Sequence, residues 1–391
     1  MRSSALRTTL AGPIALSLAL AACDRDSTGP DPASPSLIRA GAEADAGGAV
    51  YTSTNGASAN AILAFRRAED GALTPIGSFP SGGRGTGGAV DPLASQYAVI
   101  LSADHRLLFT VNAGSNDVTS YRVRDDGGLT LADRRSAGGT LPVSLASRGG
   151  LLYVLNAGDN TVAGLRVDPQ GKLIAIPQGT RRLASGAGGA STIHFSADGR
   201  RVIVTERTAN RLETLAVEAS GRLGEPVATA SSGAVPFGFD VTAGGVAVVS
   251  EAGGTAATAP NSGVSSYATG GSGTPSLLTG SIDAGGKAAC WVVVTTDGTA
   301  FVANSASNAI ASVRVNGDGS LALLDAAAGA TPSGATPIDI DLSTGDRFLY
   351  ALEAGSGNIG VFAVDGATLT PGTAVPTGVA GASGLQGIAA F

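Results

Sequence analysis

Short apolar runs alternate with glycine-containing turns along most of the chain. In residues 191–223 three apolar runs are separated by an Asp-Gly turn at 198–199 and by a polar turn at Asn210. Asp-Gly between two apolar runs favours a β-hairpin, because a type I′ turn needs two residues that tolerate positive φ. Gly221 marks the next hairpin and opens a fourth run. The pattern therefore predicts a four-stranded antiparallel sheet.

This unit recurs along the chain, and one such sheet cannot bury both of its faces without stacking against copies of itself. The second apolar run appears seven times, and six of its copies end on an amide or a carboxylate. These polar residues recur every 44 to 53 residues, a period typical of the blades of a β-propeller. They are Asn112, Asn156, Glu206, Glu251, Asn304 and Glu353.

The two ends of the repeat array are complementary. Residues 384–391 match the first strand of a unit, whereas the N-terminal unit begins at Ala49 with a second strand. We expect the C-terminal strand to be the innermost strand of the N-terminal blade, because ring closure removes exposed sheet edges. A solenoid, the main structural alternative, keeps polar caps at both ends. The predicted fold is all-β: a seven-bladed β-propeller with four antiparallel strands per blade.

Two segments interrupt the repeats, at residues 80–97 and 252–262. The first joins two blades, and the second lies in the middle turn of one blade. In a propeller these two kinds of loop share one face, so we expect both insertions to overhang the same mouth of the central channel. Surface loops of this kind often carry function.

The amino-acid composition fits this fold and limits the kinds of binding partner that we expect. Of 391 residues, 58 are glycine and only 4% are aromatic, which suits many turns between short strands. A hydrophobic content of 43% excludes wholesale disorder. The net charge is −6 and the sequence has no basic run, so nucleic acid is not expected as a partner. A closed ring needs no second copy, so we expect a monomer.

The N-terminus resembles a bacterial lipoprotein signal. Two arginines precede an apolar run over residues 10–20 that is too short to span a bilayer, and the run closes on Leu-Ala-Ala-Cys23, which resembles a lipobox. The resemblance implies that Cys23 is lipidated and anchors the protein to a membrane of the cell envelope, facing the periplasm or the exterior. The alternative is ordinary cleavage that leaves Cys23 as a spare thiol. The predicted parts are a signal peptide at 1–22, a flexible tether at 23–47 and the propeller at 48–391.

The repeats also resemble a known family. The pattern YVxNxxxNxV followed by DGxL, with FSADGRRVIVTE at 195–206 as the best local match, resembles the lactonase-like seven-bladed β-propellers. That family includes 6-phosphogluconolactonase and carboxymuconate-lactonizing enzymes, and the resemblance covers residues 48–391. Enzymatic members carry a Pro-Arg-His triplet just before the matched segment. Here the corresponding residues are Ala190, Ser191 and Thr192, so the cationic and imidazole groups are missing.

Two side chains of the predicted inner strands are candidates for catalysis. His194 lies between two apolar residues, and Asp240 lies in an inner strand of the next repeat. A carboxylate in an inner strand must be hydrogen-bonded or face water. Because the two side chains belong to adjacent blades, we expect that they can pair and act as a general base. The alternative is that His194 is a hydrogen-bonded interior histidine.

Further carboxylates suggest a ligand site. Asp341 holds the same place in its repeat as Asp240, and Asp339 lies two residues earlier. Three glutamates at the ends of second strands are expected to form a ring at one mouth with the equivalent amides, and an oxygen-rich ring suits Ca²⁺. The alternative is that each caps the backbone of its own turn. The sequence has no His/Cys cluster for zinc, so no metal or other cofactor is assigned. The three glutamates are Glu206, Glu251 and Glu353.

These observations leave the class of function open between a binding protein and an enzyme. The first hypothesis is a non-catalytic propeller that binds a protein, a glycan or a small molecule through its loop-bearing face, outside the cytoplasm. The second is a hydrolase of lactones similar to 6-phosphogluconolactone or muconolactone, in which His194 and Asp240 replace the missing residues. A structural role in an envelope assembly is a third hypothesis.

Overall fold

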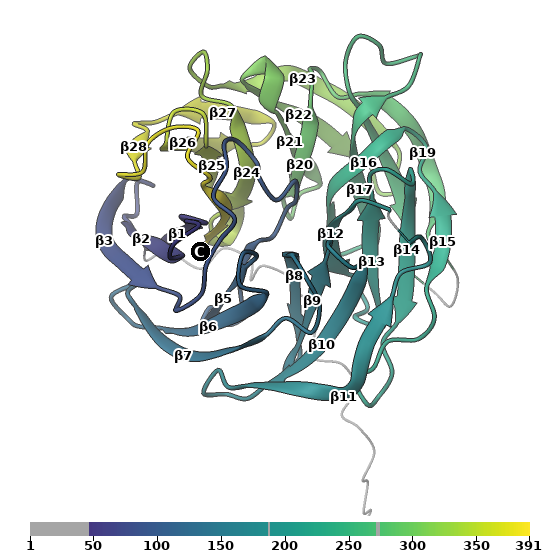
Figure 1. Ribbon diagram of the computed structural model, residues 1–391. Coiled ribbons are helices and arrows are strands. Elements are labelled where there is room, and N and C mark those ends of the chain that lie inside the picture. The colour runs from purple at the N-terminus through teal and green to yellow at the C-terminus, as the bar shows by residue number, and fades with distance from the viewer. Residues whose placement is uncertain (1–46, 187, 271–273) are drawn as a thin grey trace, which may run out of the picture. The chain divides into compact units, whose positions relative to one another are not determined.

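The computed structural model describes residues 47–186, 188–270 and 274–391 (Figure 1). Its strands form seven sheets arranged in a ring, which confirms the predicted seven-bladed β-propeller. The predicted signal peptide, Cys23 and the tether up to residue 46 lie outside the described residues. Helices in the described part are limited to the 3₁₀ turns η1 (Ser305–Ser307) and η2 (Thr344–Asp346), and neither has the length and apolar character that crossing a membrane requires.

Each blade is an antiparallel sheet whose strands follow one another from the axis outwards. Blade 1 contains β1 (Gly48–Ser53), β2 (Ala61–Arg67), β3 (Leu73–Pro80) and, innermost, β29 (Gln386–Ala390). Blade 2 contains β4 (Val99–Leu101), β5 (Leu107–Asn112), β6 (Asp117–Val123) and β7 (Leu129–Ser136). Blade 3 contains β8 (Pro142–Arg148), β9 (Leu151–Asn156), β10 (Thr161–Val167) and β11 (Leu173–Arg182). Blade 4 contains β12 (Ala190–Phe195), β13 (Arg201–Glu206), β14 (Arg211–Ala216) and β15 (Val227–Ala230).

The remaining three blades follow the same order. Blade 5 contains β16 (Ala234–Val241), β17 (Val246–Gly254), β18 (Gly263–Ala268) and β19 (Ser276–Asp283). Blade 6 contains β20 (Ala289–Val294), β21 (Thr299–Asn304), β22 (Ala309–Val315) and β23 (Leu321–Ala330). Blade 7 contains β24 (Pro337–Leu342), β25 (Phe348–Glu353), β26 (Asn358–Asp365), β27 (Thr368–Pro371) and β28 (Val375–Pro376). Both β27 and β28 pair with β26, so the outermost strand of this blade is split in two.

The ring closes between the two ends of the propeller. β29 pairs antiparallel with β1, and Ala390 lies opposite Val50. The Phe391 N–H donates to the Ala49 carbonyl at 3.0 Å, and the buried Arg67 donates from Nε to the Phe391 carbonyl at 2.8 Å. The predicted closure by the C-terminal strand is therefore confirmed. The innermost strands follow one another round the axis in the order β29, β4, β8, β12, β16, β20 and β24, and β24 lies beside β29 again.

Tyrosines of the second strands tie neighbouring blades together. Three of them are fully buried, and each donates its hydroxyl to the carbonyl of a turn glycine in the next blade. These glycines have positive φ and belong to the hairpins between third and fourth strands, so the same turns shape one blade and bind another. The pairs are Tyr51 with Gly127 at 2.8 Å, Tyr153 with Gly221 at 2.8 Å and Tyr350 with Gly71 at 2.9 Å.

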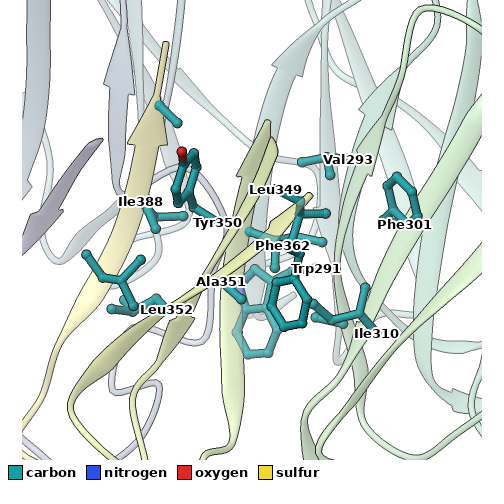
Figure 2. Close-up of a cluster of buried hydrophobic side chains, with 14 of the residues drawn as sticks. Trp291, Val293, Phe301, Ile310, Leu349, Tyr350, Ala351, Leu352, Phe362 and Ile388 are labelled. Atoms are coloured by element: carbon teal, nitrogen blue, oxygen red, sulfur yellow. The ribbon is translucent and has the colours of Figure 1, made fainter. Parts of the chain in front are cut away.

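The hydrophobic core lies between the blades. Figure 2 shows the part where Trp291 of blade 6 and Leu349 of blade 7 lie in one buried cluster with Ile388 of the closing strand. Burying a large apolar side chain contributes about 1.5–3 kcal/mol relative to leaving it exposed. Because β29 contributes to this cluster, its apolar packing stabilises the ring in addition to its strand pairing with β1.

Candidate functional site

A short segment of the first insertion fills the axis of the ring. Residues 91–97, here called the plug, belong to the connection between β3 and β4, which crosses the centre of the ring in Figure 1. Ser95 donates to the Val143 carbonyl of blade 3 at 2.8 Å, and Gln96 donates to the Val292 carbonyl of blade 6 at 2.7 Å. The Tyr97 hydroxyl donates to a third blade, at the Phe239 carbonyl, at 3.2 Å. The plug is therefore bonded to inner strands on different sides of the axis.

The plug contacts the start of β12, at residues 190–192, where the sequence resemblance leads one to expect Pro-Arg-His in an enzyme. Ser191 donates from Oγ to the Ala94 carbonyl at 2.8 Å, and Thr192 Oγ1 accepts the Gln96 N–H at 3.4 Å. Ala190, Ser191 and Thr192 all have 0% exposure. Small side chains at these three positions make room for the plug.

His194 and Asp240 both lie on inner strands, half-buried, but each has other partners. His194 Nδ1 lies 2.9 Å from the Phe195 carbonyl oxygen, and its ring is 5.4 Å from the Tyr97 ring. Asp240 Oδ1 accepts the Val241 N–H at 2.7 Å, and Oδ2 accepts the Val294 N–H of the next blade at 2.9 Å. A catalytic pair of these two residues stays a prediction.

Asp341 repeats the arrangement of Asp240. Its Oδ1 accepts the Leu342 N–H at 2.9 Å, and its Oδ2 accepts the Ala390 N–H of β29 at 2.8 Å. Both carboxylates thus accept backbone N–H groups that the open edge of the next inner strand would otherwise leave unpaired. This position in the repeat links adjacent blades.

Asp339 lies in a different environment, beside the plug. Its side chain is 1% exposed, its φ is 41°, and neither carboxylate oxygen has a hydrogen-bond partner of acceptable geometry. Burial raises the pKa of Asp339 well above its usual value, the charges of Asp341 and Asp91 raise it further, and the N–H dipoles of Tyr97 and Ile388 offset this only in part. Burial beside the plug therefore favours the neutral form of Asp339, and its positive φ is a strained conformation for a residue other than glycine.

Sequence reasoning missed two charged residues, one in the plug and one that acts on it. Asp91 of the plug accepts the Gln386 amide at 3.2 Å, and burial raises its pKa to about 7. Arg207 contributes a positive charge that lowers the pKa of Asp91, and its buried Nε has no hydrogen-bond partner. The sequence contains a signal for Arg207. In five other repeats, the residue that follows the polar end of the second strand is small. The equivalents of Arg207 are Ala113, Ala157, Ala252, Ser305 and Ala354.

Five of the six repeated polar residues bond to the preceding blade or to the loop that leaves it. Glu206 accepts Asn160 Nδ2 at 2.9 Å and Ser185 Oγ at 2.5 Å, both from blade 3 or the loop that leaves it. Glu251 accepts Ser231 at 3.1 Å in the same way, and Glu353 accepts Ser356 of its own turn at 3.3 Å. All six are at most 1% exposed, so they do not present a ring of oxygens to solvent. Within the part of the chain that the structure describes, no three His, Cys, Asp or Glu side chains are arranged to hold a metal ion.

Glu206 also belongs to a buried charge cluster. Arg211 donates to Glu206 Oε2 at 2.6 Å and lies 2.5 Å from Glu213 Oε1, and both glutamates are fully buried. Burial alone would raise the pKa of Glu206, but hydrogen bonds from Ser185, Asn160 and Arg211 hold it below its usual value. Burial and the charge of Glu206 raise the pKa of Glu213. Both glutamates also accept hydrogen bonds from blade 3 or the loop that leaves it, so the cluster links blades 3 and 4.

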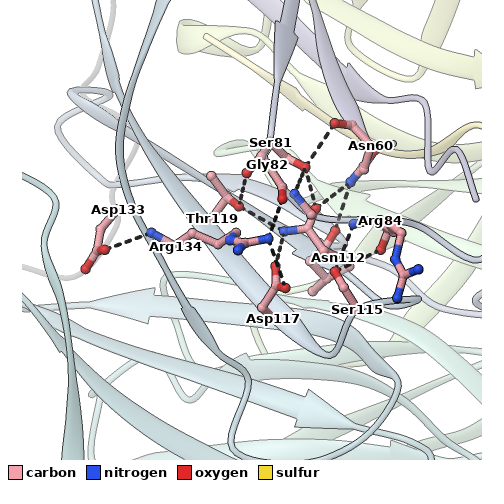
Figure 3. Close-up of polar contacts among 12 residues, drawn as sticks. Asn60, Ser81, Gly82, Arg84, Asn112, Ser115, Asp117, Thr119, Asp133 and Arg134 are labelled. Carbon is pink, nitrogen blue, oxygen red and sulfur yellow. Dashed lines mark hydrogen bonds and ion pairs between the residues drawn. The ribbon is translucent and has the colours of Figure 1, made fainter. Parts of the chain in front are cut away.

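A pocket of about 570 Å³ opens between blades 1 and 2, where the first insertion leaves β3. Figure 3 shows the polar residues around it. Its lining includes two cationic side chains, Arg84 and Arg134, one carboxylate, Asp117, and the hydroxyls of Ser58 and Ser115. None of the residues predicted from the sequence to form a site lines this pocket.

The chain is similar to known proteins both in sequence and in structure. The family model for the lactonase seven-bladed β-propeller matches residues 93–182 and 171–258. A search among curated proteins found no match. Among solved structures, a candidate 6-phosphogluconolactonase from Bacteroides uniformis has a TM-score of 0.67 at 19% identity, covering 87% of this chain and 99% of that chain. A second, from Bacteroides fragilis, has a TM-score of 0.69 at 15% identity, covering 89% and 99%. The periplasmic gluconolactonase of Pseudomonas aeruginosa has a TM-score of 0.67 at 21% identity, covering 87% and 98%.

The family match and the structural neighbours cover different parts of the chain. The family match spans β4 to β17 and therefore includes strands of blades 2 to 5. The structural neighbours share the whole ring, but at such low identity they show a shared fold and not a shared chemistry. The repeats, the closure of the ring and the family match together identify the chain as a lactonase-like seven-bladed β-propeller.

Proposed function

We propose that this protein is a binding propeller, anchored by lipid outside the cytoplasm, that does not hydrolyse lactones. The observation that carries this proposal is the position of the plug over residues 190–192. Enzymes of the family place a cation and an imidazole there, whereas here the three side chains are small, fully buried and in part bonded to the plug. A lactone that reached this point would find no group to hold its charge or to move its proton.

The proposed location rests on the sequence around Cys23. A lipidated cysteine followed by a tether would hold the propeller away from the membrane and leave its loop-bearing face free for a ligand. The structural neighbour from Pseudomonas aeruginosa is described as periplasmic, which agrees with this location. Labelling cells with a radioactive fatty acid tests the anchor: the wild-type protein should be labelled, and Cys23→Ser should be unlabelled and leave the membrane fraction.

The absence of lactonase activity is tested directly. Full-length protein in detergent is assayed in a pH-stat with gluconolactone, 6-phosphogluconolactone and muconolactone. We expect rates equal to spontaneous hydrolysis for all three. Steady turnover of any of them by the purified protein would contradict the proposal.

A lactone hydrolase with a rearranged site is the second candidate, and one observation favours it. The Nδ1 atom of His194 faces the Phe195 carbonyl, so a proton on Nδ1 leaves Nε2 as a free base. If the protein is a hydrolase of this kind, His194→Ala removes the activity while the melting temperature stays near that of the wild type. Inactivity of both forms would dispose of this candidate.

A further inference from the structure

The outermost strands of the seven blades differ in how their free edges are protected. Each of these strands lies at the end of its sheet, so one of its edges has no strand partner among the described residues. Such edges invite pairing with another chain, and proteins protect them with charged side chains, prolines or short strands. Five of the seven edges have this protection. β3 contains two prolines, β7 contains Asp133, Arg134 and Arg135, β11 contains Pro177, Arg181 and Arg182, β15 has four residues, and the split edge of blade 7 has strands of four and two residues.

The edges of blades 5 and 6 lack this protection. β23 is ten residues long, contains no proline and has a single charged residue, Asp325. β19 is eight residues long, contains no proline and has a single charged residue at its last position, Asp283. Register shifts interrupt the pairing of both strands, but shifts also occur in β3, β7 and β11, so they do not distinguish these two edges. β19 and β23 are therefore the edges that are most open to another chain.

Large apolar side chains are exposed on the same two strands. Leu277 and Leu278 of β19 are 53% and 40% exposed, and Leu323 and Leu324 of β23 are 36% and 44% exposed. The two strands belong to adjacent blades (Figure 1), and Leu278 packs on the turn between β22 and β23, where a Cβ atom added at Gly319 would overlap its Cδ1. Exposed apolar patches of this kind mark binding surfaces. The surface formed by β19 and β23 with these four leucines is here called the leucine edge.

Charge is distributed unevenly round the ring. Residues 234–391, which form blades 5 to 7 and the closing strand, contain eleven acidic and three basic residues, whereas residues 47–233 contain fifteen acidic and eighteen basic ones. Three exposed acids lie on the blade that contains β23: Asp325 on β23 itself, Asp318 in the turn between β22 and β23, and Asp297 in the turn between β20 and β21. The leucine edge therefore belongs to the acidic half of the ring.

This charge narrows the choice of partner. A second copy that paired through the same edge would bring two acidic halves together, with Asp325 of each copy near the other. A bilayer that contains anionic lipids would repel the edge. A basic partner would gain electrostatic attraction along the same surface, so charge complementarity favours it.

We propose that the leucine edge binds an extended segment of another protein, rich in basic and apolar residues, which adds a strand to blade 6 along β23. Backbone hydrogen bonds to the free edge supply affinity, and alternate side chains of the segment supply specificity. Its apolar side chains cover Leu323 and Leu324, and its basic side chains face Asp318 and Asp325. The inference names a partner for the proposed binding function, but at a surface on the outer rim, away from the plug at the axis.

The test measures the binding of fluorescent peptides to the full-length protein by anisotropy, both in detergent and in phosphatidylcholine nanodiscs. The probe is the peptide Lys-Leu-Lys-Val-Lys-Leu-Lys, and its acidic counterpart has glutamate in place of each lysine. A third peptide has the sequence of the probe but is N-methylated at its three central residues, which removes backbone donors and keeps the side chains. We expect the probe to bind with a Kd of about 100 μM or tighter and the other two peptides to bind at least about tenfold more weakly.

Two variants locate the binding surface. Leu324→Lys should weaken binding of the probe by about fivefold or more, since it removes an apolar contact and adds a charge that repels the probe. Leu131→Lys is the matched control, because Leu131 is 48% exposed on β7, the edge strand of blade 2 in the other half of the ring. It should bind the probe within about twofold of the wild type. Failure of the probe to bind, equal binding by Leu324→Lys, or equal binding of the three peptides would overturn this inference.

Two further results would assign the leucine edge to a different occupant and overturn the inference in the same way. Sedimentation equilibrium in detergent that finds dimers of the wild type and monomers of Leu324→Lys would assign the edge to a second copy. Probe binding in detergent that disappears in nanodiscs would assign it to the bilayer surface. Lactone turnover, in contrast, would overturn the proposed function and leave the leucine edge as a binding surface.

Discussion

Gln96 and Val292 exchange two hydrogen bonds across the axis of the propeller. Gln96 Nε2 donates to the Val292 carbonyl at 2.7 Å, and the Val292 N–H donates back to Gln96 Oε1 at 3.3 Å. These residues belong to the segment that leads into blade 2 and to blade 6, which lie on opposite sides of the ring. The side chain of Gln96 therefore satisfies backbone groups on the channel-facing edge of β20, and it braces the ring from within.

Removing this brace should destabilise the propeller. Gln96→Ala leaves the buried N–H and carbonyl of Val292 without those partners, which costs about 1–3 kcal/mol of the free energy of unfolding. Urea denaturation of both proteins measures the difference. The control is Gln170→Ala, because Gln170 is exposed in a hairpin turn and should change the stability by less than about 0.5 kcal/mol. Equal losses of stability in the two variants would show that the contact across the axis contributes no more to the free energy of unfolding than an exposed glutamine does.

The stability of the protein should fall as the pH rises. Asp339 and Asp91 have pKa values raised by burial, to about 7 for Asp91. In the unfolded chain both titrate near pH 4, so the folded protein holds more protons in the window between about pH 4 and 7. The stability that these protons provide is complete below about pH 4 and is lost as the pH rises through the folded-state pKa of each group, which is about 7 for Asp91. We expect the melting temperature to be lower at pH 8 than at pH 5.

Asp339→Asn tests the source of this pH dependence. An amide of the same shape keeps the site neutral at every pH, so the variant should melt at a higher temperature than the wild type at pH 8 and show a shallower fall from pH 5 to pH 8. Asp318→Asn serves as the control, because hydrogen bonds from Ser320 lower the pKa of that exposed carboxylate below its usual value. If the melting temperature of Asp339→Asn falls from pH 5 to pH 8 as steeply as that of the wild type, Asp339 is not the cause of the pH dependence.

Removing the partly exposed side chain of Arg211 should lower the free energy of unfolding more than removing most other side chains at the surface. It is 22% exposed, but it neutralises two glutamates that are 0% exposed, Glu206 and Glu213. Arg211→Ala leaves these carboxylates facing each other in the interior. We therefore expect the free energy of unfolding to fall by about 3 kcal/mol or more at neutral pH. Arg222→Ala breaks an exposed pair with Glu218 on the same blade and should cost less than about 1 kcal/mol. Chemical denaturation distinguishes the two, and similar losses would contradict the importance of burial.

The thiol of Cys290 should be unreactive in the folded protein. It is buried, burial raises its pKa well above the usual value, and the charge of Asp91 raises it further. Titration with a chromogenic disulfide reagent should therefore detect no reaction of Cys290 until guanidinium unfolds the chain. The sequence contains two cysteines, so the unfolded protein should show one thiol if Cys23 is lipidated and two if Cys23 is free. Fast labelling of Cys290 in the native state would contradict its burial.

Much of the architecture could be predicted because it depends on local patterns. Asp-Gly and related pairs specify hairpins because the glycine adopts a positive φ, and the repeat of apolar runs predicts how the blades stack. The site was harder to predict. The sequence places Glu206 and Glu251 at the ends of second strands, but not the Ser185 and Ser231 hydroxyls that bind them from the preceding blades. Arg207 could have been found, because it replaces a small residue of the repeat.

The sequence by itself determined seven blades, their order and the closure between β29 and β1. It did so because hairpins are local and because the two incomplete ends of the repeat array complete each other. Only the tertiary structure decided what fills the axis and which polar groups meet there. The glycine-rich insertion has no periodicity that would predict its path, and the partners of the plug come from blades that are distant in sequence. Their proximity is a consequence of the closed ring, which brings every inner strand to the same axis.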